Sequence, residues 1–290
     1  GVMNGSTLTY SEGEIVYTDL STGGYYFTPP YRVDMYYCAG GVSGACKGSG
    51  DDRQSETVYD EYDAYGNVLS VAQFGDINDP ADDSITQRTF AYNPAAWIVG
   101  LPASETVYKG AYPSTTPDTT KIYAAATYYY DGVSDCSVAA NSQVPALGNL
   151  SRVVRLNNAG ASPETWAGYD GYGNAVCTRD GNGNINWVSY DGSHSFPKLS
   201  INPLGQQATT QYYGVDGVPA DNGQYGEVKS VTGLNNVATT YLYDPLGRQT
   251  RVTRADGSWT SKSYNNFGTI NKPNIQASQN VRVDNPAGLW

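Results

Sequence analysis

TTYLYDPLGRQTRVTR, residues 239–254, contains one complete copy of the pattern that decides the fold. A tyrosine-rich run leads into Asp244, and a run of alternating residues follows Gly247. An Asp at the first turn position can accept a hydrogen bond from the backbone two residues on. Pro245 presets its own φ, and glycine tolerates a positive φ. The stretch therefore predicts two antiparallel strands joined by a type I turn that a glycine bulge closes.

The same Asp/Asn-x-x-Gly turn recurs along the chain. Its first and fourth residues are Asp63 and Gly66, Asp170 and Gly173, Asp180 and Gly183, Asn202 and Gly205, Asp244 and Gly247, and Asn265 and Gly268. From Asp170 onward the offsets between copies are 10, 22, 42 and 21 residues, close to multiples of half of 21. A strand of about six residues plus a turn of about four accounts for the half-period. We therefore expect tandem β-hairpins with aromatic residues aligned across neighbouring strands.

The composition agrees with an all-β chain. Its 290 residues include 26 Tyr and 33 Gly but only five Phe and two Met. Tyr, Thr and Val favour half-buried strands, whereas Gly, Asn, Asp and Pro favour turns. No long window shows the apolar spacing of an amphipathic helix.

The charge balance excludes several classes of partner. The formal net charge is -11, and Lys and Arg form no cluster. A nucleic-acid-binding protein needs a basic surface that releases counterions, so we expect no nucleic-acid partner. No apolar run is long enough to span a bilayer, so we expect no membrane insertion. Residues 1–10 lack the basic start and apolar middle of a signal peptide, so a secretion signal would have to lie outside this sequence.

Four cysteines indicate an oxidising compartment. Cys38 and Cys46 flank a glycine-rich segment that is a natural setting for a local disulfide, and Cys136 and Cys177 could then pair across neighbouring hairpins. Four reduced thiols are the alternative, because spacing alone does not determine connectivity. The spacings match no zinc site. Sequons at Asn4 and Asn149 are candidate glycosylation sites.

The tyrosine-linked turns resemble a known repeat. Tyr243-Asp-Pro-Leu-Gly-Arg248, followed by Asp256-Gly257, resembles the YD repeat of RHS proteins, which include bacterial polymorphic toxins, insecticidal toxin complexes and teneurins. Tyr62-Asp63, Tyr169-Asp170 and Tyr190-Asp191 begin less complete matches. The resemblance covers about residues 59–75 and 150–270 and extends in weaker form over 75–102. It implies hairpins that join edge to edge into a strip, which spirals into a hollow shell.

Three segments follow from these patterns. Residues 1–58 are expected to be β-rich with a disulfide loop, residues 59–149 to hold early, degenerate repeats with insertions, and residues 150–290 to hold regular repeats. Asp284-Asn-Pro-Ala-Gly-Leu289 resembles part of the self-cleaving core that ends many RHS shells. The other elements of that core are missing here, so we interpret the motif as the start of another hairpin.

Catalytic and metal sites find little support. His194 is the only histidine, and its surroundings predict a solvated turn residue. Asp180, Asn182 and Asn184 imitate the first ligands of an EF-hand loop, but Ile185 stands where that loop requires glycine. The acidic loop that holds Asp76, Asp79, Asp82 and Asp83 is a better calcium candidate, and a solvated loop is the alternative. We expect neither an enzyme nor an obligatory cofactor.

The sequence therefore predicts an extended or curling all-β sheet, or a hollow shell, with a structural role. The primary hypothesis is the wall of a shell or casing in a secreted or cell-surface bacterial protein, located outside the cell or on its surface. Its partners would be other segments of a longer chain or identical copies paired through strand edges. One alternative is a filament subunit that assembles by strand addition. Another is a module that adheres to glycans or receptors through tyrosines such as Tyr128–Tyr130 and Tyr212–Tyr213, although such tyrosines more often seal a sheet.

Overall fold

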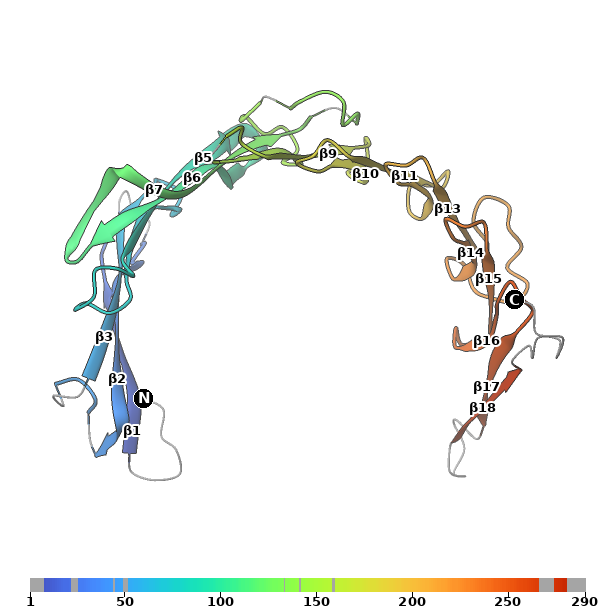
Figure 1. Cartoon of the computed structure of the whole chain (residues 1–290), viewed down its shortest axis with the longest axis horizontal. Helices are drawn as coiled ribbons and strands as arrows, with labels where there is room; N and C mark the ends of the chain where they lie inside the picture. The colour runs from blue at the N-terminus through green and yellow to red at the C-terminus, as the bar shows by residue number, and fades with distance from the viewer. Residues whose placement is uncertain are drawn as a thin grey trace. The chain divides into compact units, whose positions relative to one another are not determined.

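The computed structural model describes residues 8–21, 26–43, 45–48, 52–132, 134–140, 142–157, 160–265 and 274–280. These residues form eighteen β-strands and one short 3-10 helix, η1 (Pro94–Ala96). Strands that follow one another along the chain pair with one another, and the pairs are antiparallel, as hairpins require (Figure 1). The all-β, hairpin-repeat fold predicted from the sequence is confirmed.

The chain divides into two compact units. The first contains Gly1–Val133 with Val138–Trp166, and the second contains Ser134–Ser137 with Ala167–Trp290. The strands of the first unit are β1 (Leu8–Tyr17), β2 (Pro30–Ser43), β3 (Asp52–Tyr62), β4 (Val68–Phe74), β5 (Ser84–Asn93), β6 (Ile98–Ala111), β7 (Ser114–Tyr130) and β8 (Leu150–Arg155). Many of them are longer than the predicted six residues, and β7 reaches 17.

The second unit follows the predicted half-period closely. After β9 (Glu164–Tyr169), which has residues in both units, its strands are β10 (Ala175–Arg179), β11 (Ile185–Tyr190), β12 (Pro197–Ile201), β13 (Gln207–Tyr212), β14 (Val228–Thr232), β15 (Ala238–Tyr243), β16 (Gln249–Thr253), β17 (Trp259–Asn265) and β18 (Asn274–Asn280). These strands, β9 included, have five to seven residues. Turns separate most of them, except that a longer segment joins β13 to β14.

Clusters of buried apolar side chains in the described part of the chain all lie in the first unit. The largest contains Val58, Ala72, Phe74 and Ile85, with Ile77 packed against it. Ala72 pairs with Val58 on one side and with Ile85 on the other, so the three side chains share one face of the sheet. Register across three strands therefore aligns this cluster.

Two smaller clusters complete the core of the first unit. Tyr36 packs with Cys38 and Cys46, and Ala91 and Ala103 pack with Tyr130. The described residues include no helix that is long and apolar enough to cross a membrane. The three predicted segments, 1–58, 59–149 and 150–290, were defined by the regularity of the repeat and stay predictions.

Candidate functional site

The turn at Asp63 shows how the repeat is built. Asp63 and Gly66 close the turn, because the Gly66 amide donates to the Asp63 carbonyl at 3.2 Å and the Asp63 amide donates to the Asn67 carbonyl at 3.0 Å. The Asp63 side chain accepts from the Tyr65 and Asn67 amides, each at 2.8 Å. Gly66 has φ 88°, which L-residues rarely adopt. This is the turn chemistry expected from the sequence.

Four other predicted turns repeat this geometry. In each, the glycine amide donates to the carbonyl of the first residue at 2.9–3.1 Å, and the glycine φ lies between 76° and 87°. Their first and fourth residues are Asp170 and Gly173, Asp180 and Gly183, Asn202 and Gly205, and Asp244 and Gly247. Asn265 is the last residue of β17, whereas Gly268 lies outside the described residues.

The residue after each turn glycine has a role that the sequence analysis missed. Its side chain bonds the side chain of the first turn residue: Asn67, Asn174 and Asn184 donate amide hydrogens to their Asp partners, and Arg248 donates its Nε–H to Asp244 at 2.7 Å. In the turn that begins with asparagine, Asn202 donates to Gln206 at 2.8 Å. The sequence carries a pattern that could have revealed this role, since the position after the glycine holds only Asn, Gln or Arg in these five turns.

These bonds favour the ionised carboxylates. Desolvation raises the pKa of Asp170, but hydrogen bonds from Asn174, Tyr172 and His194 outweigh it and bring the pKa down to about 2. The pKa of Asp180 is also lowered, chiefly by hydrogen bonds from Asn184. At Asp244, desolvation again opposes the charge, and bonds from Arg248 and Leu246 hold the pKa below its usual value.

Three further turns depart from the Asp/Asn-x-x-Gly pattern, because another residue takes the place of its first member, its fourth member or both. Asn236 has φ 59° in the turn closed by Gly233 and Val237, and His194 has φ 57° in the turn that begins at Asp191. Arg254 replaces the usual Asp in a turn where the Gly257 amide donates to the Arg254 carbonyl at 2.9 Å. Asparagine tolerates the left-handed region, which explains the first substitution.

His194 links two turns. Its ring stacks on Tyr172 with a centroid distance of 4.2 Å, and its Nδ1 lies 3.4 Å from Asp170 Oδ2. Its carbonyl accepts from the Asn174 side chain at 2.8 Å. This side chain therefore bridges the turn at residues 191–196 and the turn at residues 170–174, a role that the sequence analysis did not foresee.

The cysteines form two disulfides, Cys38–Cys46 and Cys136–Cys177. The first was expected to close a glycine-rich loop. Instead, Cys38 lies within β2, and most of the glycine-rich segment continues this strand to Ser43. The second disulfide links the segment Ser134–Ser137 to the rest of the second unit, to which the segment belongs. A Cβ at Gly168 would lie 2.6 Å from Cys177 Sγ and 2.8 Å from the Ser134 carbonyl carbon. Only glycine at this position therefore leaves room for the Ser134 backbone and the disulfide sulfur.

Hydrogen bonds hold both ends of the Asn149 sequon. Ser151 is 3% exposed, and its hydroxyl donates to the Asn149 carbonyl at 3.2 Å and accepts from the Gly132 amide at 2.8 Å. The Asn149 amide donates to Asp131, which also accepts the amides of residues 146–148. This geometry does not favour modification of the folded chain, and glycosylation stays a prediction. Asn4 and Asp284–Leu289 lie outside the described residues.

The acidic loop is neutralised in part by the protein itself. Arg53 lies 3.2 Å from Asp76 Oδ2 and 3.7 Å from Asp82 Oδ2. Asp79 accepts the Ala81 amide, and the buried Asp83 accepts the Tyr112 amide at 2.8 Å. Within the described ranges no three acidic, histidine or cysteine side chains are grouped to hold a metal. Calcium binding at this loop stays a prediction.

Two carboxyl groups meet on strands β2 and β3. Asp34, which is 1% exposed, lies directly opposite Glu56 in the ladder. Arg32 Nε lies 3.0 Å from Asp34 and 4.0 Å from Glu56. Burial raises the pKa of Glu56, the Asp34 charge raises it further, and Arg32 only partly opposes the shift. Two acids therefore share one cation in the first unit.

Tyrosine hydroxyls bind backbone carbonyls across the hairpins. In the second unit, Tyr190 and Tyr212 are the last residues of their strands and Tyr264 is the last but one. Their hydroxyls donate to the carbonyls of Ala175, Pro197 and Gln249, each 15 residues earlier. Each of these carbonyls belongs to the first residue of the paired strand. The tyrosine of each of these hairpins is thereby bonded to the start of the preceding strand.

The tyrosines proposed as a glycan surface are partly inside the protein. Tyr130 is 2% exposed and donates to the Pro102 carbonyl at 2.6 Å, and Tyr213 is 1% exposed and donates to the Tyr241 carbonyl at 2.8 Å. Burial with a satisfied hydroxyl is the arrangement expected of tyrosines that seal a sheet. These two residues are therefore not available to stack on a ligand.

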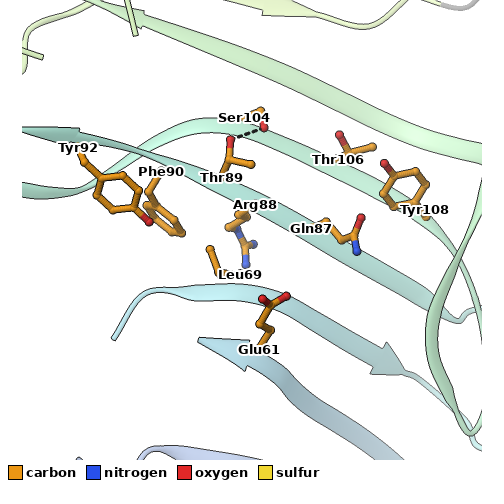
Figure 2. Close-up of a pocket in the computed structure, with 10 residues that line it drawn as sticks. All are labelled: Glu61, Leu69, Gln87, Arg88, Thr89, Phe90, Tyr92, Ser104, Thr106 and Tyr108. Atoms are coloured by element: carbon orange, nitrogen blue, oxygen red, sulfur yellow. Dashed lines mark hydrogen bonds between the residues drawn. The ribbon is translucent and has the colours of Figure 1, made fainter. Parts of the chain in front are cut away.

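A shallow hollow of about 480 Å³ lies over strands β3 to β6 in the first unit (Figure 2). Its lining residues are Glu61, Leu69, Gln87, Arg88, Thr89, Phe90, Tyr92, Ser104, Thr106 and Tyr108. Thr89 and Ser104 bond each other at 2.7 Å, and Arg88 pairs with Glu105 at 2.7 Å. Tyr92 donates to Asp63 at 2.6 Å, and burial followed by this bond raises the pKa of Tyr92 to about 12.

No protein-family model matches the chain, and no curated protein sequence matches it. Solved structures do match. A crystal structure of TcdB2-TccC3-Cdc42 superposes with a TM-score of 0.62 at 11% identity, over 84% of this chain and 15% of that one. A mutant of the Photorhabdus luminescens Tc holotoxin pore gives 0.60 at 9% identity, over 89% and 15%. The chain shares its fold with these toxin structures.

A third match has the same character. A crystal structure of TcdB2-TccC3 without its hypervariable C-terminal region gives a TM-score of 0.60 at 10% identity, over 88% of this chain and 16% of that one. The chain therefore spans about a sixth of the length of the toxin chains that it matches. At such low identity the likeness concerns the fold, and it is consistent with the RHS resemblance of the turns.

Proposed function

We propose that this chain forms part of the wall of an extracellular shell or casing, as a structural and non-catalytic segment of a secreted bacterial protein. The observation that carries the proposal is the fold shared with the Tc toxin structures. In this chain that fold is built from hairpins with self-closing turns and hydroxyl-to-carbonyl bonds. Such repeats extend a sheet without needing a deep core in each hairpin.

Two further features support an extracellular wall. Four cysteines form two disulfides, which persist in oxidising compartments and are rare in the cytosol. The six described side chains of β18, Asn274–Gln279, are all exposed. A strand from another segment of a longer chain, or from another copy, is the partner that we propose for this strand.

Electron microscopy of the protein, purified without truncation, tests the proposal. Closed hollow particles are the expected result. Fibres in which copies join end to end would replace the casing with the filament alternative, and dispersed flat monomers would contradict both. The expected particles would also need to persist when salt is raised, because paired strands are held by backbone hydrogen bonds and apolar contacts that salt screens little.

Labelling on opposite faces of one strand gives a second test. Asn186 and Ser189 are both exposed in β11, and an odd separation places them on opposite faces of the sheet. All four native cysteines are in disulfides, so Asn186→Cys and Ser189→Cys each add one reactive thiol. In a casing, N-ethylmaleimide should label both variants, whereas a large polyethylene-glycol maleimide should label only one. Equal labelling by the large reagent contradicts an enclosing wall.

A further inference from the structure

The hollow in Figure 2 contains a band of polar side chains on one face of the sheet. Gln87 of β5 pairs with Thr106 of β6, and Thr89 pairs with Ser104. Residues that pair directly across antiparallel strands, and residues two apart within a strand, point to the same face. These four side chains therefore form a compact group of one amide and three hydroxyls. Tyr108, two residues beyond Thr106, extends the same face.

Most of this hydrogen-bonding capacity is unused. Thr89 and Ser104 bond each other at 2.7 Å. The side chains of Gln87, Thr106 and Tyr108 form no hydrogen bond or ion pair with any other residue that the structure describes, and neither does the Glu61 carboxylate. An amide offers two donors and an acceptor, and each hydroxyl offers one donor and an acceptor. The hollow therefore presents several donors and acceptors within reach of one another.

Aromatic rings frame the polar band. Figure 2 shows Phe90 and Tyr92 toward one end of the hollow and Tyr108 toward the other. The Tyr92 hydroxyl is held by Asp63 at 2.6 Å, which orients its ring. Aromatic rings next to exposed amides and hydroxyls suit a ligand that has both apolar C–H surfaces and many hydroxyls.

Charge and backbone pairing exclude other ligands. Glu61 is aligned with Gln87 through Ser70, so its carboxylate places a negative charge on this face, where an anionic ligand would be repelled. Arg88, one position after Gln87, is paired with Glu105 at 2.7 Å, and because side chains alternate along a strand this ion pair lies on the other side of the strands. The backbone of β5 pairs with β4 and β6 on its two sides. An extended peptide lying on this face could not pair its own amides and carbonyls with the backbone of β5, because those backbone groups already bond to the neighbouring strands.

We propose that this hollow binds a neutral saccharide, with Gln87 and Thr106 as its main hydrogen-bonding groups and Tyr108 as a stacking ring. Each saccharide hydroxyl both donates and accepts, which matches the mixed polar groups of the band. Because the hollow is shallow and open to solvent, binding should be weak for a single chain and stronger when several copies are presented together. The proposal does not depend on the casing function.

Titration calorimetry with maltohexaose, cellohexaose, mannohexaose and chitohexaose tests the proposal on the whole chain. At least one probe should bind saturably, and affinity should change little with salt because the ligand is uncharged. Gln87→Ala should weaken that binding by about tenfold, the loss expected when a hydrogen-bonding group is removed. Tyr108→Ala should weaken it similarly, whereas Tyr108→Phe should retain the stacking part.

Gln73→Ala is the matched control, since Gln73 is an exposed glutamine of the adjacent strand β4 that does not line the hollow. It should leave the affinity unchanged. Failure of all four probes to bind would overturn the proposal, and so would equal weakening by Gln73→Ala and Gln87→Ala. Preference for a sulfated oligosaccharide, or for an extended peptide that binds at Gln87, would overturn it as well.

Discussion

The first unit builds its sheet from long strands and buries apolar clusters between strand faces and loops, whereas the second unit uses five- to seven-residue strands and closely spaced turns. Among its described residues, the buried apolar side chains of the second unit are Cys136, Cys177, Tyr213 and Val215. The same antiparallel hairpin is therefore stabilised in two ways. Apolar burial dominates in one unit, and turn hydrogen bonds with tyrosine hydroxyls dominate in the other.

Phe74→Ala should have the largest effect, and only in the first unit. Phe74 is fully buried in the main cluster and meets Tyr112 edge-on at 5.2 Å. Truncating a buried phenylalanine typically costs about 3–5 kcal/mol. Hydrogen exchange measured by mass spectrometry should show lost protection in β3 to β5 and little change in β10 to β17. Gln73→Ala, on the exposed neighbour, should leave both units protected.

Removing the Cys136–Cys177 disulfide should weaken the second unit. The bond closes a separation of 41 residues, for which the chain-entropy model gives about 4 kcal/mol. Cys136→Ser with Cys177→Ser should lower the denaturant midpoint of the second unit and expose Ser134–Ser137 to protease. The Cys38–Cys46 disulfide closes a shorter separation, of eight residues. Replacing both of these cysteines with serine should lower stability in the first unit instead. If removal of either disulfide destabilised both units equally, the assignment of each disulfide to one unit would be wrong.

Acid should weaken the turns of the second unit. The pKa of Asp170 lies at about 2 and those of Asp180 and Asp244 are lowered, so their stabilisation is present above the unfolded pKa near 4 and is lost as pH falls through the folded values. Hydrogen exchange, corrected for its intrinsic pH dependence, should show the Asp170 turn opening between about pH 4 and pH 2, and the turns of Asp180 and Asp244 opening as the pH falls below about 4. Asp170→Asn, which copies the natural Asn202, should remove the acid dependence of its own turn.

Glu56 should give the opposite pH dependence in the first unit. Its folded pKa is raised by burial and by Asp34, so the folded state favours the protonated acid. Stability is then fully present below the unfolded pKa near 4.5 and is lost as pH rises through the folded pKa. Glu56→Gln should abolish this loss around β2 and β3 in urea melts at stepwise increasing pH. An unchanged pH dependence in the variant would show that Glu56 is not the group responsible.

Tyr264→Phe should have the smallest effect. It removes one hydroxyl-to-carbonyl bond to Gln249, worth about 1 kcal/mol, and keeps the ring under Arg248. The loss should appear as faster exchange in β16 and β17. Tyr172→Phe, on a ring that is 73% exposed, is the control and should be neutral.

Local chemistry explains how much of this protein could be predicted. Turn residues act within four or five positions of one another, so Asp63, Asp180 and Asp244 could be assigned to turns from the sequence alone. The side-chain partner at the fifth position was readable too, in Asn67 and Arg248, although its role was missed. His194 and Asn236 were harder to assign, because they occupy a positive φ without being glycine.

By itself the sequence determined the hairpin period, the turn chemistry and the all-β class, since each depends on neighbours along the chain. Only the tertiary structure decided which distant residues meet. It placed Glu56 opposite Asp34, brought Ser134 and Cys177 close around Gly168, and set Gln87 beside Thr106. These contacts depend on the register between strands, and a shift of one residue would turn each side chain to the other face of the sheet.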